Sequence, residues 1–200
     1  MAAAEHRRGP VMRRLASGCL AAALVWPMTQ AESERALALG RAFDAERAKF
    51  HRPYLIPVSD ATVERLEIVT EFRRVVLFAE EQIQHGDHMF GVRQSEAALA
   101  RWHGRVTIVA HLRFHPLNTY ISAPSYDVIA GDPPIEQLDL RRTALYAQAS
   151  NKKGRQTALS GEIVEADFDA QTIGQAVRPI RVVFEGKEVT KTTVDFARLE

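Results

Sequence analysis

The pattern of hydrophobic and polar positions changes character near the middle of the chain. In the first half, apolar residues recur every three or four positions, the spacing of an amphipathic helix. This spacing predicts helices over 33–50, 71–85 and 95–102. Ser33 is a suitable N-cap for the first helix, and Gly86 is expected to end the second. Arg73 and Arg74 fall outside the apolar face of that second helix, on the side expected to face water or its edge.

After Gly104 the apolar residues alternate with polar ones, which is typical of strands. Strands are predicted at 63–69, 106–114, 119–122, 126–130, 138–147, 160–168, 180–185 and 188–197. Residues 185–187 form a hairpin turn between the last two strands, and 169–176 hold a helical turn. Two prolines within 51–57 exclude a helix there, so this segment is expected to be extended.

Short strands separated by turn residues favour antiparallel sheets over a parallel α/β arrangement. The predicted fold class is therefore α+β: an antiparallel β-sandwich-like domain with N-terminal helices packed at one edge or end. We expect a single domain over 32–200, with a helical part over about 33–103 and a β-rich part over about 104–200. A length of 200 residues is enough to bury one hydrophobic core.

The N-terminal segment has the pattern of a secretory signal peptide. Arg13 and Arg14 precede an apolar run over 15–26, and Ala31 offers a small residue for cleavage. The apolar run is too short to span a membrane comfortably. Residues 1–31 are therefore predicted to be a signal peptide, with Met12 as an alternative translation start. The predicted location of the mature protein is periplasmic or secreted.

Charge and cysteine usage exclude several classes of function. Four of the 26 basic residues and one of the 25 acidic residues lie in 1–31, which leaves 22 basic and 24 acidic residues in the predicted domain. This near balance gives no basic field for nucleic acid. The only cysteine, Cys19, lies within the predicted signal, so the mature protein would have no thiol. Disulfides, cysteine nucleophiles and thiolate metal sites are thereby excluded.

Five of the seven histidines lie between positions 85 and 115. The candidate metal ligands among and beside them are His85, Asp87, His88, His111 and His115. Imidazole nitrogens with one carboxylate would suit zinc or copper. In the alternative interpretation, His85 caps a helix C-terminus and the others are solvated, because the spacing matches no established metal motif.

Other candidate groups are a basic loop, an acidic strand and a pair of tyrosines. Lys152, Lys153 and Arg155 surround a glycine and are candidates for holding an anionic partner, although such a loop is commonly just solvated. The acidic run at 162–169 is expected to form the solvated side of an amphipathic strand. Tyr120 and Tyr126 form either a recognition edge or part of the core.

No catalytic motif links the chain to a reaction. The expected function is that of a non-enzymatic exported protein, acting as a binding domain or as an accessory in the cell envelope, with an envelope protein or a small ligand as its partner. We expect no nucleic-acid partner and no stable membrane span after signal cleavage. The alternatives are a histidine-based zinc or copper protein and, more distantly, a hydrolase with dispersed histidines and carboxylates.

Overall fold

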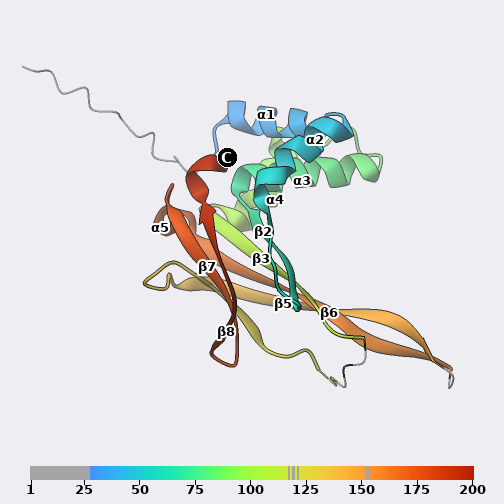
Figure 1. The fold of residues 1–200 in the computed structure, drawn as a ribbon. Coiled ribbons are helices and arrows are strands. Elements are labelled where there is room, and N and C mark those ends of the chain that lie inside the picture. Colours follow the sequence, from blue (N-terminus) through green and yellow to red (C-terminus); the bar gives the residue numbers. More distant parts are fainter. Residues whose placement is uncertain (1–27, 117, 119, 121, 152–153) are drawn as a thin grey trace, which may run out of the picture.

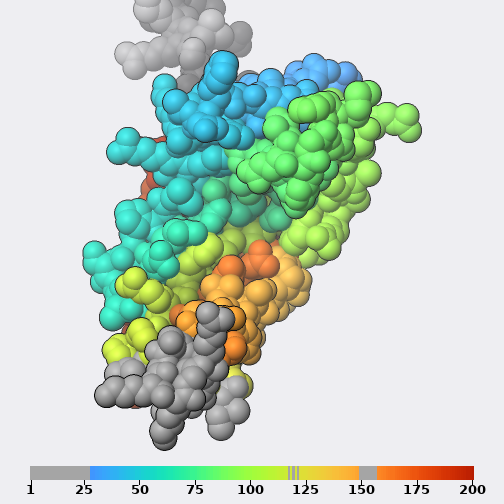
Figure 2. Space-filling model, turned by 90° about the vertical axis from the view of Figure 1, so that its right-hand side faces the viewer, coloured from blue at the N-terminus to red at the C-terminus, as the bar shows by residue number. Residues whose placement is uncertain are grey.

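Two antiparallel sheets face each other, and the helices gather at one end of them (Figure 1). The computed structural model describes residues 28–116, 118, 120, 122–151 and 154–200. A space-filling view shows the helical residues above the strands (Figure 2). The α+β class and the antiparallel sandwich with helices at one end are confirmed. Most of the predicted signal peptide lies outside the described residues, and within them no helix has the length and apolar character that crossing a membrane requires.

The predicted helix over 33–50 is two helices, α1 (Gln30–Gly40) and α2 (Asp44–His51). Thr29, rather than Ser33, caps α1, in a capping box with Glu32. Gly40, the last residue of α1, packs directly on the helix that carries Ala79, since a Cβ atom at Gly40 would lie 2.6 Å from the Cβ atom of Ala79. The prediction of one continuous helix was wrong, because the apolar spacing does not reveal the interruption over 41–43.

The second predicted helix is α3 (Glu71–Gln84), and Gly86 ends it as expected. Gly86 has a φ of 78°, and the amide of Asp87 donates to the carbonyl of Gln82 over 2.8 Å, the outer bond of a Schellman motif. Helix α4 (Val92–Leu99) and a 3₁₀ turn, Ala100–Trp102, cover the whole of the third predicted helix, which starts three residues earlier than expected. The helices share an apolar cluster of their own, made of Ala36, Leu37, Phe72, Val75, Val76, Ala79, Phe90, Leu99 and Trp102.

The larger sheet has the strand order β1-β2-β3-β6-β5. Its strands are β1 (Leu55–Pro57), β2 (Val63–Val69), β3 (Arg105–Arg113), β5 (Gln137–Asn151) and β6 (Gly154–Asp169). Strands β5 and β6 form a long hairpin that extends beyond the sandwich (Figure 1). The segment 51–57 is extended only in part, because a 3₁₀ turn spans Arg52–Tyr54, where a proline in the first turn is tolerated.

The smaller sheet has the order β4-β7-β8, with β4 (Tyr126–Ala130), β7 (Val177–Phe184) and β8 (Lys187–Asp195). Glu185 and Gly186 both have positive φ, 49° and 76°, as a two-residue hairpin turn requires. A helical turn, α5 (Ala170–Ile173), joins the two sheets, and a 3₁₀ turn, Phe196–Arg198, follows β8. The strand predicted at 119–122 is not formed at the described positions 120 and 122.

The two faces of the larger sheet have different surroundings. One face packs against the smaller sheet and supplies fully buried apolar residues such as Ile108, Val164 and Phe168. The other face meets the helices through polar side chains. Arg73 of α3 donates to Glu67 of β2 over 2.6 Å, and Arg74 donates to Thr107 of β3 over 2.6 Å. Arg73 is only 2% exposed, so its predicted position on the wet side of the helix was wrong.

Candidate functional site

A pocket of about 750 Å³ lies at the end of the sandwich opposite the helices. The helices follow the C-terminal end of β2, whereas the pocket lies at its N-terminal end, where Val63 pairs with Leu112 of β3. Beyond this point the β5–β6 hairpin projects away from the smaller sheet (Figure 1). The pocket is lined by Ala61, Thr62, Arg113, Phe114, His115, Pro116, Asn118, Tyr120, Tyr126, Ala147, Gln148, Ala158, Leu159 and Ser160.

Aromatic rings form the inner wall of this pocket. The ring centroids of Phe114 and Tyr126 are 6.2 Å apart, and Tyr126 stacks on Phe184 at 4.9 Å. Tyr120 meets Phe114 edge-on at 5.3 Å. Tyr126 thus contacts both Phe114, which follows β3 of the larger sheet, and Phe184 of the smaller sheet. Tyr126 is buried and Tyr120 is 47% exposed, so the two tyrosines join the core to the pocket opening.

Polar groups hold the loop that borders the pocket. The side-chain amide of Asn118 donates to the carbonyl of Leu159 over 2.9 Å and to that of His115 over 2.6 Å. Its side-chain oxygen accepts from the amide of Tyr120 over 3.1 Å. Asn118 therefore fastens the segment after β3 to β6 and sets the position of Tyr120. Thr62 and Ser160 add hydroxyl groups to the lining.

Glu162 is the unusual group beside this pocket. It lies two residues after Ser160 on β6, on the face that carries Val164, and is only 2% exposed. Its Oε2 atom is buried without a hydrogen-bond partner. Burial raises the pKa of Glu162, and the charge of Arg142 opposes this only in part. Burial also raises the pKa of Tyr126, to which the charges of Tyr120, Asp60 and Glu162 add.

Arg142 joins the two sheets next to this carboxyl group. Its guanidinium donates to the main-chain carbonyl of Tyr126 over 2.9 Å and to the carboxylate of Asp127 over 2.6 Å. These contacts direct Arg142 toward β4, so that among the described residues its hydrogen bonds go to Tyr126 and Asp127 and not to Glu162. A buried carboxyl group with a raised pKa thus lies near the ring of Tyr126.

The predicted metal ligands lie in separate parts of the fold. His85 is the C-cap of α3, and Asp87 and His88 are exposed in the following turn. His111 lies 3.1 Å from the carboxylate of Glu67, and His115 lines the aromatic pocket. Among the described residues no group of three or more His, Cys, Asp or Glu side chains is placed to hold a metal ion. The zinc or copper site therefore stays a prediction.

Three histidines are paired with glutamates instead. Besides the pair of His111 with Glu67, His51 lies 2.7 Å from Glu80 and His103 lies 2.8 Å from the fully buried Glu71. The first two pairs are linked, because Arg73 contacts both His51 and Glu67. These pairings place the histidines between the helices and the larger sheet, a position that their spacing along the chain does not reveal.

Two other predictions concern charged groups of the β5–β6 hairpin. Lys152, Lys153 and the side chain of Arg155 lie outside the described residues, so the anionic-partner loop stays a prediction. The acidic run at 162–169 was expected to be solvated, and this was wrong for Glu162 and for Asp167, which is completely buried. Arg141 donates two hydrogen bonds to it, over 2.8 and 3.1 Å, and Thr107 donates one over 2.7 Å.

Taken together, the aromatic pocket is apolar inside and polar at its rim, which is the usual chemistry of a small-molecule site. Sequence analysis found Tyr120 and Tyr126 but not the pocket, since that depends on how the two sheets diverge. Comparison of the chain with models of protein families, with curated proteins and with solved structures finds no match.

Proposed function

We propose that this protein is an exported binding domain that holds a small, mainly apolar ligand in the aromatic pocket at the end of its sandwich. One observation carries the proposal: a pocket of about 750 Å³ lies against the aromatic side chains of Phe114, Tyr120 and Tyr126. Ligand pockets are commonly 300–1,000 Å³ and lined by aromatic and apolar side chains with a few polar groups.

The lining residues suggest the chemistry of the ligand. Phe114, Tyr120 and Tyr126 offer ring faces and edges to an aromatic or branched apolar group. The rest of the apolar lining includes Leu159 and two small residues, Ala147 and Ala158, which leave space for a ligand. The hydroxyl of Ser160 donates to the carbonyl of Leu145 over 3.1 Å and its oxygen can still accept, which favours a ligand with a hydrogen-bond donor at its outer end. The ligand class is therefore an apolar, partly aromatic molecule with a polar end.

Export is proposed from the N-terminal sequence. Arg13 and Arg14, the apolar run over 15–26 and the small residue Ala31 follow the order of a secretory signal. The absence of cysteine after residue 31 agrees with a domain that needs no thiol chemistry in an oxidising compartment. A ligand-binding domain without a catalytic motif fits an accessory role in the cell envelope.

Titration with N-phenyl-1-naphthylamine, a neutral aromatic probe that fluoresces in apolar surroundings, tests the pocket. We expect saturable binding at one site. The variant Ala158→Trp fills the pocket from β6 and should weaken binding by about tenfold or more, since an indole excludes the probe sterically. Ala45→Trp is the matched control, because Ala45 is exposed on α2.

Two results would overturn the binding proposal. The first is an absence of saturable fluorescence enhancement with the folded protein. The second is an affinity that Ala158→Trp leaves unchanged while the circular dichroism spectrum and melting temperature match those of the parent protein. Cleavage of the signal is tested separately, by mass spectrometry of the protein recovered after expression in a bacterium. Retention of residues 13–31 would contradict export by this route.

A further inference from the structure

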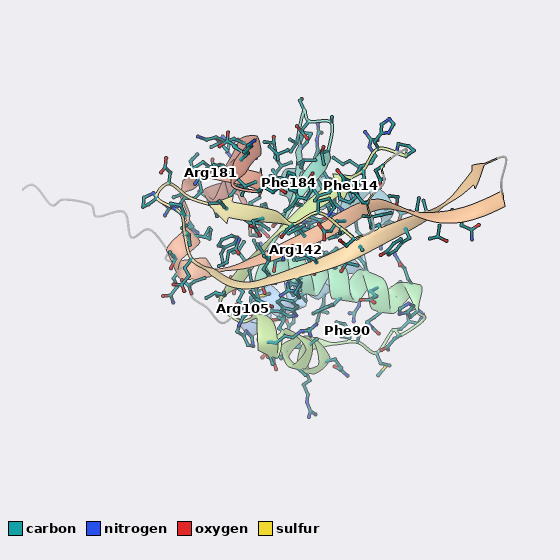
Figure 3. All side chains as sticks on the ribbon, turned by 90° about the horizontal axis from the view of Figure 1, so that it is seen from below. Phe90, Arg105, Phe114, Arg142, Arg181 and Phe184 are labelled. Carbon is teal, nitrogen blue, oxygen red and sulfur yellow. The ribbon has the colours of Figure 1, made fainter. Side chains whose placement is uncertain are left out.

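A second cavity, of about 510 Å³, lies between the helices and the larger sheet, on the opposite face of that sheet from the inter-sheet core. It is lined by Arg74, Arg101, Trp102, Arg105, Asp139, Arg141, Glu165 and Asp167. Arg105 points toward the helical side of the sheet, away from Phe114 and Phe184 (Figure 3). Seven of these eight side chains are charged, so the cavity differs in character from the aromatic pocket.

Arg141 is the shared ion-pair partner of the three carboxylates of this cavity. It contacts Asp139 at 2.6 Å, Asp167 at 2.8 Å and Glu165 at 3.4 Å. Asp167 receives further hydrogen bonds from Thr107 and, at 3.5 Å, a weak one from Arg105. The three acidic groups therefore converge on one guanidinium, but the cavity holds four arginines against three carboxylates, so its side chains carry a net charge of +1.

Arg74 and Arg101 have no carboxylate within salt-bridge distance among the described residues. Arg74 donates to the hydroxyl of Thr107 over 2.6 Å, and this hydroxyl in turn donates to Asp167 over 2.7 Å. Burial lowers the pKa of Arg74 to about 10, although the charges of Asp167 and Glu165 act in the opposite direction. The guanidinium of Arg74 is thus desolvated and only indirectly compensated.

Three arginine side chains of this cavity stack on the ring of Trp102. The guanidinium carbons of Arg74, Arg101 and Arg141 lie 3.8, 4.7 and 4.7 Å from its ring centroid. Each stacking contact is favourable by itself, but three like charges around one indole repel each other. An anion in the cavity would relieve this repulsion and accept hydrogen bonds from the N–H groups that Arg74 and Arg101 do not use.

We infer that this cavity, named here the Arg74–Trp102 site, binds the phosphate or carboxylate group of a small anionic molecule. Arg74 and Arg101 would donate to its oxygens, and Arg105, which is partly exposed and weakly paired, would complete the set. Arg141 stays with Asp167 and acts as a positioning residue. Guanidinium groups suit such oxygens because their donors are arranged in a planar fork.

Isothermal titration of the protein with inorganic phosphate and with succinate, at constant ionic strength set by chloride, tests this site. We expect saturable binding of at least one of the two anions and a matching rise in melting temperature. The tighter anion identifies the group that the site prefers. Arg101→Gln should weaken this binding by about tenfold, because it removes a charge-assisted hydrogen bond. Arg101 is exposed, so this change leaves the fold intact.

The control is Arg93→Gln, which removes the same charge from an exposed position on α4 outside the cavity. It should bind as the unchanged protein does. The inference is overturned if neither anion binds more tightly than chloride, or if Arg93→Gln and Arg101→Gln lower the affinity equally. Binding of the neutral naphthylamine probe does not depend on these arginines, so the outcome is independent of the proposed function.

Discussion

The two faces of the larger sheet are held to their neighbours by different forces. Toward the smaller sheet, the interface is apolar, with residues such as Ile108 and Phe168 completely buried. Toward the helices, arginines, acids and a threonine form a hydrogen-bonded seam around Arg73, Arg74 and Asp167. Apolar burial is strong and tolerant of geometry, whereas a buried ionic seam adds stability only while every partner is present. The seam therefore fixes the position of the helices on the sandwich but adds less stability than the apolar interface does.

The largest effect is expected in the apolar interface. Phe168→Ala removes a ring that is 0% exposed and should lower the free energy of unfolding by about 3–5 kcal/mol. Urea unfolding followed by circular dichroism measures this change. Phe43→Ala is the matched control, because Phe43 is 87% exposed and its loss should cost less than about 0.5 kcal/mol. Equal costs for the two variants would contradict the assignment of the core.

The next effect should come from the seam. Asp167→Asn keeps the shape but removes the charge that Arg141 binds, and should lower the free energy of unfolding by about 3 kcal/mol. Burial by itself would raise the pKa of Asp167, but hydrogen bonds from Arg141 and Thr107 lower this pKa below its usual 3.8. This contribution is therefore complete above about pH 4 and lost as the pH falls through the folded pKa. The difference in free energy of unfolding between the parent protein and Asp167→Asn should be smaller at pH 3 than at pH 7. An equal difference at both pH values would exclude a charge effect.

Glu162 provides the opposite pH dependence within the apolar interface. Because its folded pKa is raised, the protonated form stabilises the fold below the usual pKa of 4.5, and this stability is lost as the pH rises through the folded pKa. Glu162→Gln should therefore raise the free energy of unfolding by about 1 kcal/mol at pH 7 and change little at pH 4. The control is Glu64→Gln, whose side chain is 51% exposed. Destabilisation by Glu162→Gln at pH 7 would indicate a partner for the carboxylate.

The smallest effect is expected at the surface of the helices. The ion pair of Arg47 with Asp44 on α2 resembles the pairs of the seam in chemistry, but the Asp44 side chain is 95% exposed. Asp44→Asn should therefore change the free energy of unfolding by less than about 0.5 kcal/mol. If this change matched that of Asp167→Asn in thermal unfolding, burial would not be what distinguishes the seam.

The bounds of helices and strands were predictable from the sequence where one face of the element packs against an apolar neighbour. The strands at 63–69 and 126–130 were located to the residue because their alternation follows burial directly. Arg73 and Asp167 were placed in water because a polar residue facing a polar, buried partner gives the same pattern as a solvated one. The aromatic pocket was not predictable either, since it arises where segments distant in the chain diverge.

The β5–β6 hairpin also bears on the order in which the molecule folds. Its strands pair from Asn151 with Gly154 as far as Gln137 with Phe168. Strand β3 reaches β6 only by closing a loop, as in the pairing of Arg113 with Gly161. Local pairing requires less chain entropy to be lost before contacts form, so it is kinetically favoured. The hairpin can therefore serve as the template on whose β6 edge β3, and then β2, assemble.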